Sequence, residues 1–169
     1  VNVVAIAQGS SEYNISVIIN RSDLTKGLNT VHDAFFSDLQ KTLNVFMVGV
    51  GNIGKELLFQ IREHHAYLMK NNRINIKIIG LSNSRKMLVD PEGVVLTQWE
   101  QRLEEEGKTA DLTQFVEQMK VLNLPNCVFV DNTASPYPST FYKQVFEANI
   151  SVVTCNKIAN SGEYQQFAT

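Results

Sequence analysis

The chain has 169 residues, a hydrophobic content of 44% and a formal net charge of −2 at pH 7. This length suits one ordinary domain, with or without part of a second one. The near-neutral charge argues against nucleic acid and anionic membranes as partners, and no apolar run approaches the ~20 residues of a membrane span. Without a signal-peptide pattern at its start, the protein is expected to be cytoplasmic.

The first predicted element is a β-hairpin over residues 1–19, where the runs VNVVAIA and NISVIIN flank the polar stretch QGSSEY. A helix is predicted next, with Asp23 as a candidate N-cap and apolar residues at helical spacing from Leu24 to Phe36. Two strands and one helix leave a sheet face and both edges uncovered. Residues 1–36 are therefore predicted to be half of a larger α+β unit, followed by a linker over residues 37–42.

Strand and helix patterns alternate from residue 43 onward, which predicts an α/β fold over residues 43–169: a doubly wound parallel sheet of the Rossmann type. The predicted strands are residues 43–48, 74–82, 126–131 and 150–154, and the predicted helices are residues 52–70, 97–106, 111–122 and 138–149. The acidic run from Glu104 to Glu106 is interpreted as a solvated helix face. Neither a disulfide between Cys127 and Cys155 nor a metal site is expected, since both thiols lie in apolar segments.

The most informative motif follows the first of these strands, where Gly49, Gly51 and Gly54 have the GxGxxG spacing. In a dinucleotide site the first glycine permits the tight turn, the second lets the backbone approach the pyrophosphate, and the third lets the helix pack closely on the strand. The N-terminus of the following helix then stabilises the anion. A glycine-rich turn with only a packing role is the alternative.

Ligands of an open parallel sheet bind beyond the carboxyl ends of its strands. Ser84, Arg85 and Lys86 follow the second strand, with no carboxylate before Asp90. Because a carboxylate here normally selects NAD and an Arg accepts a 2′-phosphate, NADP is favoured over NAD, with Arg85 as its ligand. Solvated surface cations are the alternative.

The ends of the third and fourth strands supply further candidates. DNTAS, which contains Thr133 and Ala134, would pass close to the nicotinamide, although these residues could equally cap a helix. CNK places Lys157 at the mouth of the same cleft, where a lone solvated lysine is the alternative.

Several segments together carry a resemblance to a known family. FMVGVGNIG, GLSNSRKML, VFVDNTAS and VVTCNKIAN resemble the cofactor domain of homoserine dehydrogenase, and AIAQGSSEYNISVII resembles the second half of an ACT regulatory module as found at the end of aspartokinase. In this order they are similar to the bifunctional aspartokinase/homoserine dehydrogenase family. The resemblance implies NAD(P)-dependent interconversion of L-homoserine and L-aspartate 4-semialdehyde in the biosynthesis of threonine, methionine and isoleucine.

The resemblance also implies roles for single residues. Gly51, Asn52 and Ile53 would contact the pyrophosphate, and Ser84 and Arg85 the adenosine ribose or its phosphate.

On the nicotinamide side, the family's pattern assigns Thr133 and Ala134. Lys157 would contact the cofactor and would also be the catalytic residue next to the substrate. Gln8 would face an amino-acid effector. The family's second lysine and acidic substrate-binding residues belong to a later domain, so this piece alone is expected to be inactive.

Two other classes of function stay open. A non-catalytic module that senses a dinucleotide and an amino acid is favoured by the open edges of the hairpin, which also favour a homo-oligomer. A methyltransferase-like domain that binds S-adenosylmethionine would usually carry an acidic residue where Arg85 stands.

Overall fold

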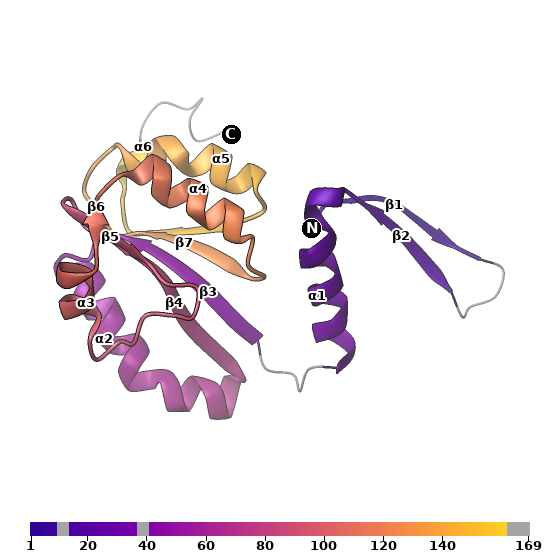
Figure 1. Cartoon of the computed structure of the whole chain (residues 1–169), viewed down its shortest axis with the longest axis horizontal. Helices are drawn as coiled ribbons and strands as arrows, with labels where there is room; N and C mark the ends of the chain where they lie inside the picture. The colour runs from indigo at the N-terminus through magenta and orange to yellow at the C-terminus, as the bar shows by residue number, and fades with distance from the viewer. Residues whose placement is uncertain (10–13, 37–40, 162–169) are drawn as a thin grey trace. The chain divides into compact units, whose positions relative to one another are not determined.

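The computed structural model describes residues 1–9, 14–36 and 41–161. Contacts divide the chain into two compact units, Val1–Leu39 and Gln40–Thr169, each described by itself (Figure 1). Of the predicted linker, residues 37–40 lie outside the described part. Lys41 and Thr42 already belong to a strand, β3 (Lys41–Val48), which begins two residues before its predicted start.

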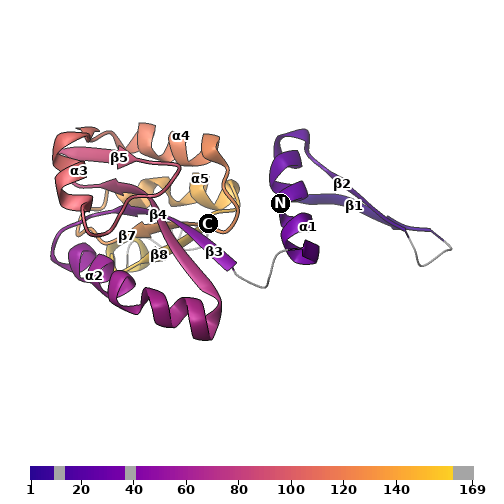
Figure 2. The ribbon, with the colours of Figure 1, turned by 60° about the horizontal axis from the view of Figure 1, so that its bottom comes forward.

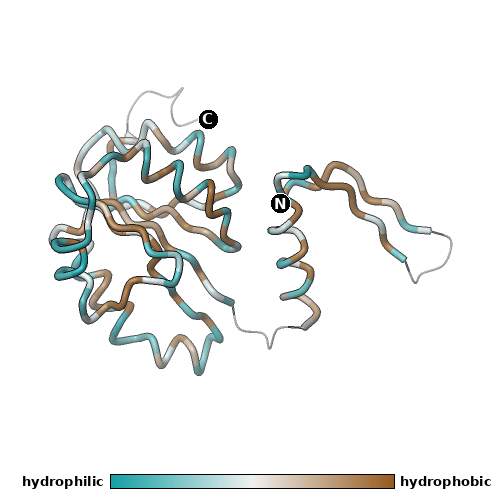
Figure 3. Tube along the Cα trace, in the orientation of Figure 1, coloured by the Kyte–Doolittle hydropathy of each residue, from teal (hydrophilic) through white to brown (hydrophobic). Residues whose placement is uncertain are grey.

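The first unit contains the predicted hairpin and helix. The strands β1 (Val3–Gln8) and β2 (Ile15–Ile19) pair antiparallel, and the 3-10 turn η1 (Arg21–Asp23) leads into α1 (Leu24–Phe36). Hydrophobic residues run along both strands (Figure 3), yet most are exposed, as the pattern of a half unit predicts. Asp23 ends the 3-10 turn, and its Oδ2 accepts a hydrogen bond from the backbone N–H of Asn2 at 3.4 Å.

The described part of the second unit contains a six-stranded sheet. Its further strands are β4 (Ile74–Ser82), β5 (Lys86–Val89), β6 (Lys108–Thr109), β7 (Cys127–Asp131) and β8 (Ser151–Thr154). The spatial order is β6-β5-β4-β3-β7-β8, and β4, β3, β7 and β8 are parallel, as predicted. The chain runs from β3 outward to β4 and then returns to the other side of β3 for β7. Strand order therefore reverses between β3 and β7, as in a Rossmann-type fold.

Parallel pairs dominate the sheet, as predicted, and two short antiparallel strands, β5 and β6, extend it at one side. Neither of these two strands was predicted, because each is too short to show a periodic pattern. A side chain folds the chain back here: Asn83 Oδ1 accepts hydrogen bonds from the backbone N–H groups of Arg85 and Lys86, each at 2.7 Å. Asn commonly stabilises a tight turn in this way.

Helices cover both faces of the sheet (Figure 2). The helices and helical turns are α2 (Asn52–Tyr67), η2 (Leu68–Asn72), α3 (Trp99–Glu105), α4 (Leu112–Leu122), η3 (Pro138–Phe141), α5 (Tyr142–Glu147) and α6 (Ile158–Ser161). One core cluster joins the sheet to α2 and α3 through Leu58 and Leu103, and the other joins it to α4 and α5 through Phe115 and Val145.

The predicted cap of α4 is confirmed, because Asp111 Oδ1 accepts from the Gln114 N–H at 3.0 Å. Among the described helices, none has the length and apolar composition needed to cross a membrane.

One glycine is required by the core itself. A Cβ on Gly80 in β4 would lie 2.5 Å from Phe46 Cδ1 and 2.8 Å from Phe115 Cζ. These two rings pack edge to face with centroids 5.7 Å apart, so they have little freedom to move aside.

We expect Gly80→Ala to lower the free energy of unfolding by about 1–3 kcal/mol through overpacking, as measured by urea denaturation. Gly51→Ala is the matched control, because nothing in the described structure lies within 4 Å of a Cβ at that position. Equal destabilisation by the two substitutions would contradict the assignment.

Candidate functional site

A pocket of about 590 Å³ lies beyond the carboxyl ends of β3, β4 and β7, at the point where strand order reverses. It is lined by the turn after β3, the turn after β4, the loop after β7, and residues 110 and 112 before and in α4. Five predicted site residues line it: Gly49, Gly51, Ser84, Arg85 and Thr133. The fold therefore brings the glycine turn, the cationic turn and the hydroxyl-bearing loop to one cavity.

Other predicted residues lie outside the lining of this pocket. Asn52, Ile53 and Gly54 form the first turn of α2, directly behind Gly51, and Ala134 is exposed beside Thr133. Lys157 is exposed in the loop that follows β8. Gln8 ends β1 in the first unit.

The glycine turn has the sterically demanding geometry that its spacing predicts. Gly49 has φ +89°, and a Cβ there would lie 2.8 Å from Thr133 Cγ2 and from the Asn132 carbonyl carbon. A Cβ on Gly54 would collide with the Gly49 carbonyl oxygen, so α2 packs closely on the turn. Space is open in front of Gly51, which is the N-cap of α2, and among the described residues no side chain caps this end.

The two cations after β4 have different surroundings. Arg85 lines the pocket, and within the described residues no carboxylate forms an ion pair with it. Lys86 points elsewhere: its Nζ lies 3.0 Å from Glu104 Oε1 and also donates to the Glu104 carbonyl oxygen. The acidic run forms the predicted solvated helix face, since Glu104 and Glu106 are exposed, and it also makes surface ion pairs, Glu104 with Lys86 and Glu106 with Arg102.

A buried carboxylate at the end of β7 was missed by the sequence analysis. Asp131 is completely buried, and its Oδ1 accepts from the Thr133 N–H at 2.8 Å. Its Oδ2 accepts from the Tyr142 hydroxyl at 2.6 Å and from Asn156 Nδ2 at 3.1 Å. Burial, together with this carboxylate, raises the pKa of Tyr142, so the hydroxyl stays protonated as a donor.

Asn156 extends this network to the loop that carries Lys157. Its Nδ2 also donates to the Ser135 carbonyl oxygen at 2.7 Å, and its Oδ1 accepts from the Ile158 N–H at 3.1 Å. The Lys157 carbonyl oxygen accepts from the Ser161 N–H at 2.9 Å, which starts α6. The backbone of Lys157 is thus fixed on both sides relative to the loop after β7. The available signal was an Asp at the end of an apolar strand and an Asn directly before Lys157.

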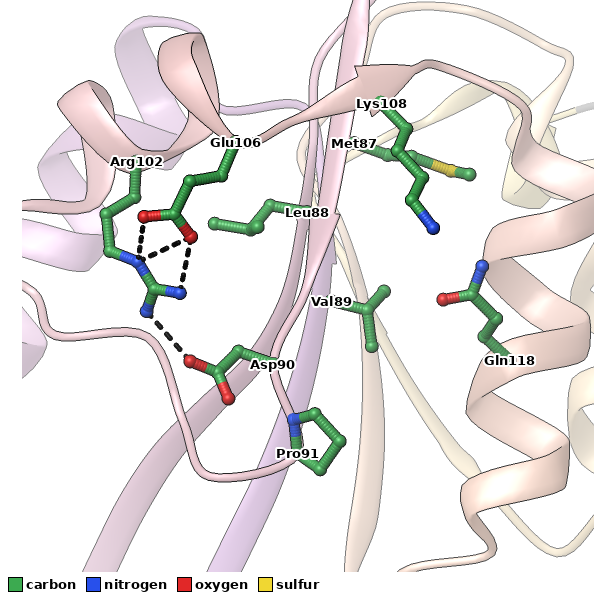
Figure 4. A pocket seen from close by; sticks show the side chains of 9 residues that line it. All are labelled: Met87, Leu88, Val89, Asp90, Pro91, Arg102, Glu106, Lys108 and Gln118. Carbon is green, nitrogen blue, oxygen red and sulfur yellow. Dashed lines mark hydrogen bonds and ion pairs between the residues drawn. The ribbon is translucent and has the colours of Figure 1, made fainter.

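A second pocket, of about 330 Å³, lies at the outer edge of β5 (Figure 4). On one side of it, Arg102 donates to Asp90 Oδ2 at 2.8 Å and to Glu106 Oε2 at 2.7 Å. Lys108 and Gln118 lie on the other side, across β5. The pocket is separate from the glycine turn, and its arginine is already matched by two carboxylates, so we assign it a structural role.

The described residues contain no group of three or more His, Cys, Asp or Glu side chains arranged to hold a metal ion. Both cysteines are free thiols; Cys127 is buried and Cys155 is exposed.

Comparison with known proteins gives matches in both units. The model of a family described as the NAD binding domain of homoserine dehydrogenase matches residues 49–169, and an ACT domain model matches residues 1–35. The chain is 40% identical over 168 residues to bifunctional aspartokinase/homoserine dehydrogenase 1, chloroplastic, of Arabidopsis thaliana, covering 99% of this chain and 18% of the relative. It is 34% identical over 163 residues to the bifunctional aspartokinase/homoserine dehydrogenase of Haemophilus influenzae, covering 96% of this chain and 20% of the relative. The chain thus spans about a fifth of the length of these relatives.

Solved structures share the fold. Homoserine dehydrogenase from Thermoplasma acidophilum superposes with a TM-score of 0.59 at 20% identity, covering 76% of this chain and 39% of that chain. A Candida auris protein of unknown function gives a TM-score of 0.60 at 22% identity, with 76% and 34% covered.

The Asp131 network predicts the effect of removing one hydroxyl. We expect Tyr142→Phe to lower the free energy of unfolding by about 1–3 kcal/mol, because the buried carboxylate loses a donor. Tyr67→Phe is the control, since Tyr67 is exposed on α2. This substitution should change the free energy of unfolding by no more than about 0.5 kcal/mol. Urea denaturation measures both, and a Tyr142→Phe variant as stable as the control would contradict the network.

The ion pairs of Arg102 with Asp90 and Glu106 predict that the stability of the fold depends on pH. The hydrogen bond from Arg102 holds the pKa of Asp90 below its ordinary value. Because folding lowers this carboxyl pKa, the contact contributes its full stability at pH values above the ordinary pKa. That contribution is lost as the pH falls through the lowered pKa. Arg102→Gln should therefore reduce the thermal midpoint more at about pH 7 than at about pH 3. An equal reduction at both values would show that the side chain acts only by packing.

Proposed function

The chain belongs to the homoserine dehydrogenase family through its NAD-binding domain, and we propose that it carries the NADP(H) site of a longer bifunctional aspartokinase/homoserine dehydrogenase. The reaction would be hydride transfer between L-homoserine and L-aspartate 4-semialdehyde. One observation carries this proposal: the pocket at the reversal of strand order joins the glycine turn, Arg85 and the Thr133 loop. A cytoplasmic location is part of the same proposal, although the plant relatives are named as chloroplastic.

The residues around the pocket fit a dinucleotide. Gly51 leaves open space at the uncapped N-terminus of α2, where the N–H groups of Asn52 and Ile53 would bind the pyrophosphate. In the turn after β4, Ser84 and Arg85 would bind the adenosine ribose and its 2′-phosphate, since a guanidinium matches phosphate oxygens in charge and geometry.

At the opposite side of the pocket, Thr133 and Ala134 would border the nicotinamide. The Thr133 N–H already donates to Asp131, so the backbone of this loop is fixed before any ligand binds. A loop held in this way keeps its geometry without a further entropic cost on binding.

Lys157 is the proposed catalytic residue of this chain. A bound nicotinamide would supply the hydride acceptor in one direction of the reaction and the hydride donor in the other. Alcohol oxidation also needs a base for the hydroxyl proton and a positive charge beside the developing alkoxide oxygen. The Lys157 ammonium supplies that charge, and in the direction of aldehyde reduction it donates toward the carbonyl oxygen. The network through Asn156 fixes its backbone beside the Thr133 loop. In this proposal the second lysine and the acidic substrate ligands come from elsewhere in the longer protein, so this chain alone does not turn over substrate.

The first unit favours a regulatory role. Its match to an ACT domain supports an amino-acid effector, with Gln8 at the end of β1 as a candidate contact. Within the described residues of this unit, no third strand pairs with its two-stranded sheet, which supports a homo-oligomer. The second candidate function, a non-catalytic sensor, rests on the same unit. Gel filtration with and without threonine would distinguish it, since a sensor changes its state of assembly.

The proposed NADP(H) site is tested by charge reversal. We expect Arg85→Glu to weaken NADPH binding by about tenfold or more and NADH binding far less, because only NADPH carries the 2′-phosphate. Fluorescence titration of the chain with each nucleotide measures both dissociation constants. Lys70→Glu is the control, with the same charge change on the exposed η2 turn. Equal weakening of both nucleotides would place phosphate recognition elsewhere, and no binding by the unsubstituted chain would overturn the dinucleotide site.

A further inference from the structure

We propose that Glu104 is a selectivity-determining residue of this site: its carboxylate lowers the preference for NADP over NAD. It does so by holding Lys86 away from the pocket and by placing a negative charge beside the Arg85 turn. The inference rests on the proposed dinucleotide site, and it concerns how strongly that site favours the 2′-phosphate.

The two cations of the turn lie in different local structures. Asn83 fixes the backbone N–H groups of both Arg85 and Lys86, and β5 begins at Lys86. Arg85 lies in the turn itself and lines the pocket. Lys86, the first residue of β5, instead reaches the end of α3 and binds Glu104 there.

The contact of Lys86 with Glu104 is made through two kinds of oxygen. Lys86 Nζ lies 3.0 Å from the carboxylate oxygen Oε1 and donates to the carbonyl oxygen of the same residue. That carbonyl lies in the last turn of α3, where a cation is also favoured by the helix dipole. Lys86 is therefore not a free second ligand for a phosphate while Glu104 is ionised.

Glu104 also acts on Arg85. The hydrogen bond from Lys86 is the main cause of the lowered pKa of Glu104, and the charge of Arg85 lowers it further. The negative charge of the Glu104 carboxylate itself repels a second anion bound at Arg85. A 2′-phosphate would meet that repulsion, whereas the neutral 2′-hydroxyl of NAD would not.

The matched experiment neutralises one carboxylate at a time. Glu104→Gln removes the charge but keeps an oxygen that can accept from Lys86. Glu105→Gln makes the same change one residue along α3, where Glu105 bonds to Gln101 instead. The dissociation constants of NADPH and NADH are measured by fluorescence titration on the 169-residue chain, at low and at high salt.

We expect Glu104→Gln to tighten NADPH binding by about threefold to tenfold and to leave NADH binding within about twofold, with the gain shrinking at high salt. Adding Lys86→Gln should return NADPH binding toward the original value. An unchanged ratio of the two dissociation constants in Glu104→Gln, or the same change in Glu105→Gln, overturns the role of Glu104. If the unsubstituted chain binds neither NADPH nor NADH, the result is a different one, because it overturns the proposed dinucleotide site and not only the role of Glu104.

Discussion

The second unit depends on the close approach of two loops at the reversal of strand order. The turn at Gly49 lies so near the loop after β7 that a single Cβ would meet Asn132 and Thr133 at 2.8 Å. The helix that follows packs equally closely, because a Cβ on Gly54 would collide with the Gly49 carbonyl oxygen. These contacts place the amide-rich start of α2 and the Thr133 loop on one cavity. Interiors packed at this density cannot absorb an added methyl group without displacing the backbone.

The hydrogen bonds to Asp131 fix the loop on a second side of the same cavity. A buried carboxylate is costly unless its oxygens accept several hydrogen bonds, and here a backbone amide, a tyrosine hydroxyl and an asparagine amide all donate to it. Those donors come from three separate segments, so satisfying one carboxylate also fixes three pieces of chain. Lys157 gains a defined backbone position from this arrangement while its side chain stays exposed. A rigid backbone with an exposed cationic end is suited to the substrate contact that is proposed for Lys157.

Much of this unit could be predicted from the sequence, because its signals are local. The glycine spacing, the apolar strands and the Asp111 cap each depend on a few consecutive residues, and all are found in the structure. The antiparallel strands β5 and β6 could not be predicted, since they are defined by pairing with β4 rather than by a pattern of their own. The burial of Asp131 and the aromatic contacts of Gly80 likewise arise from residues distant in the chain. Charge alone also could not show which of the two cations, Arg85 or Lys86, faces the pocket.

That last distinction follows from secondary structure. Two adjacent cations in a sequence suggest a doubly positive phosphate site, but here Arg85 lies in the turn and Lys86 is the first residue of β5. One cation then faces the pocket, and the other is placed beside whatever the opposite side offers, here the carboxylate of Glu104. In the proposed dinucleotide site, the charge that a phosphate would meet therefore depends on where β5 begins and on a residue of α3 that does not line the pocket. A short inner strand such as β5, which pairs with both β4 and β6, would contribute to the proposed selectivity through the side on which it places Lys86.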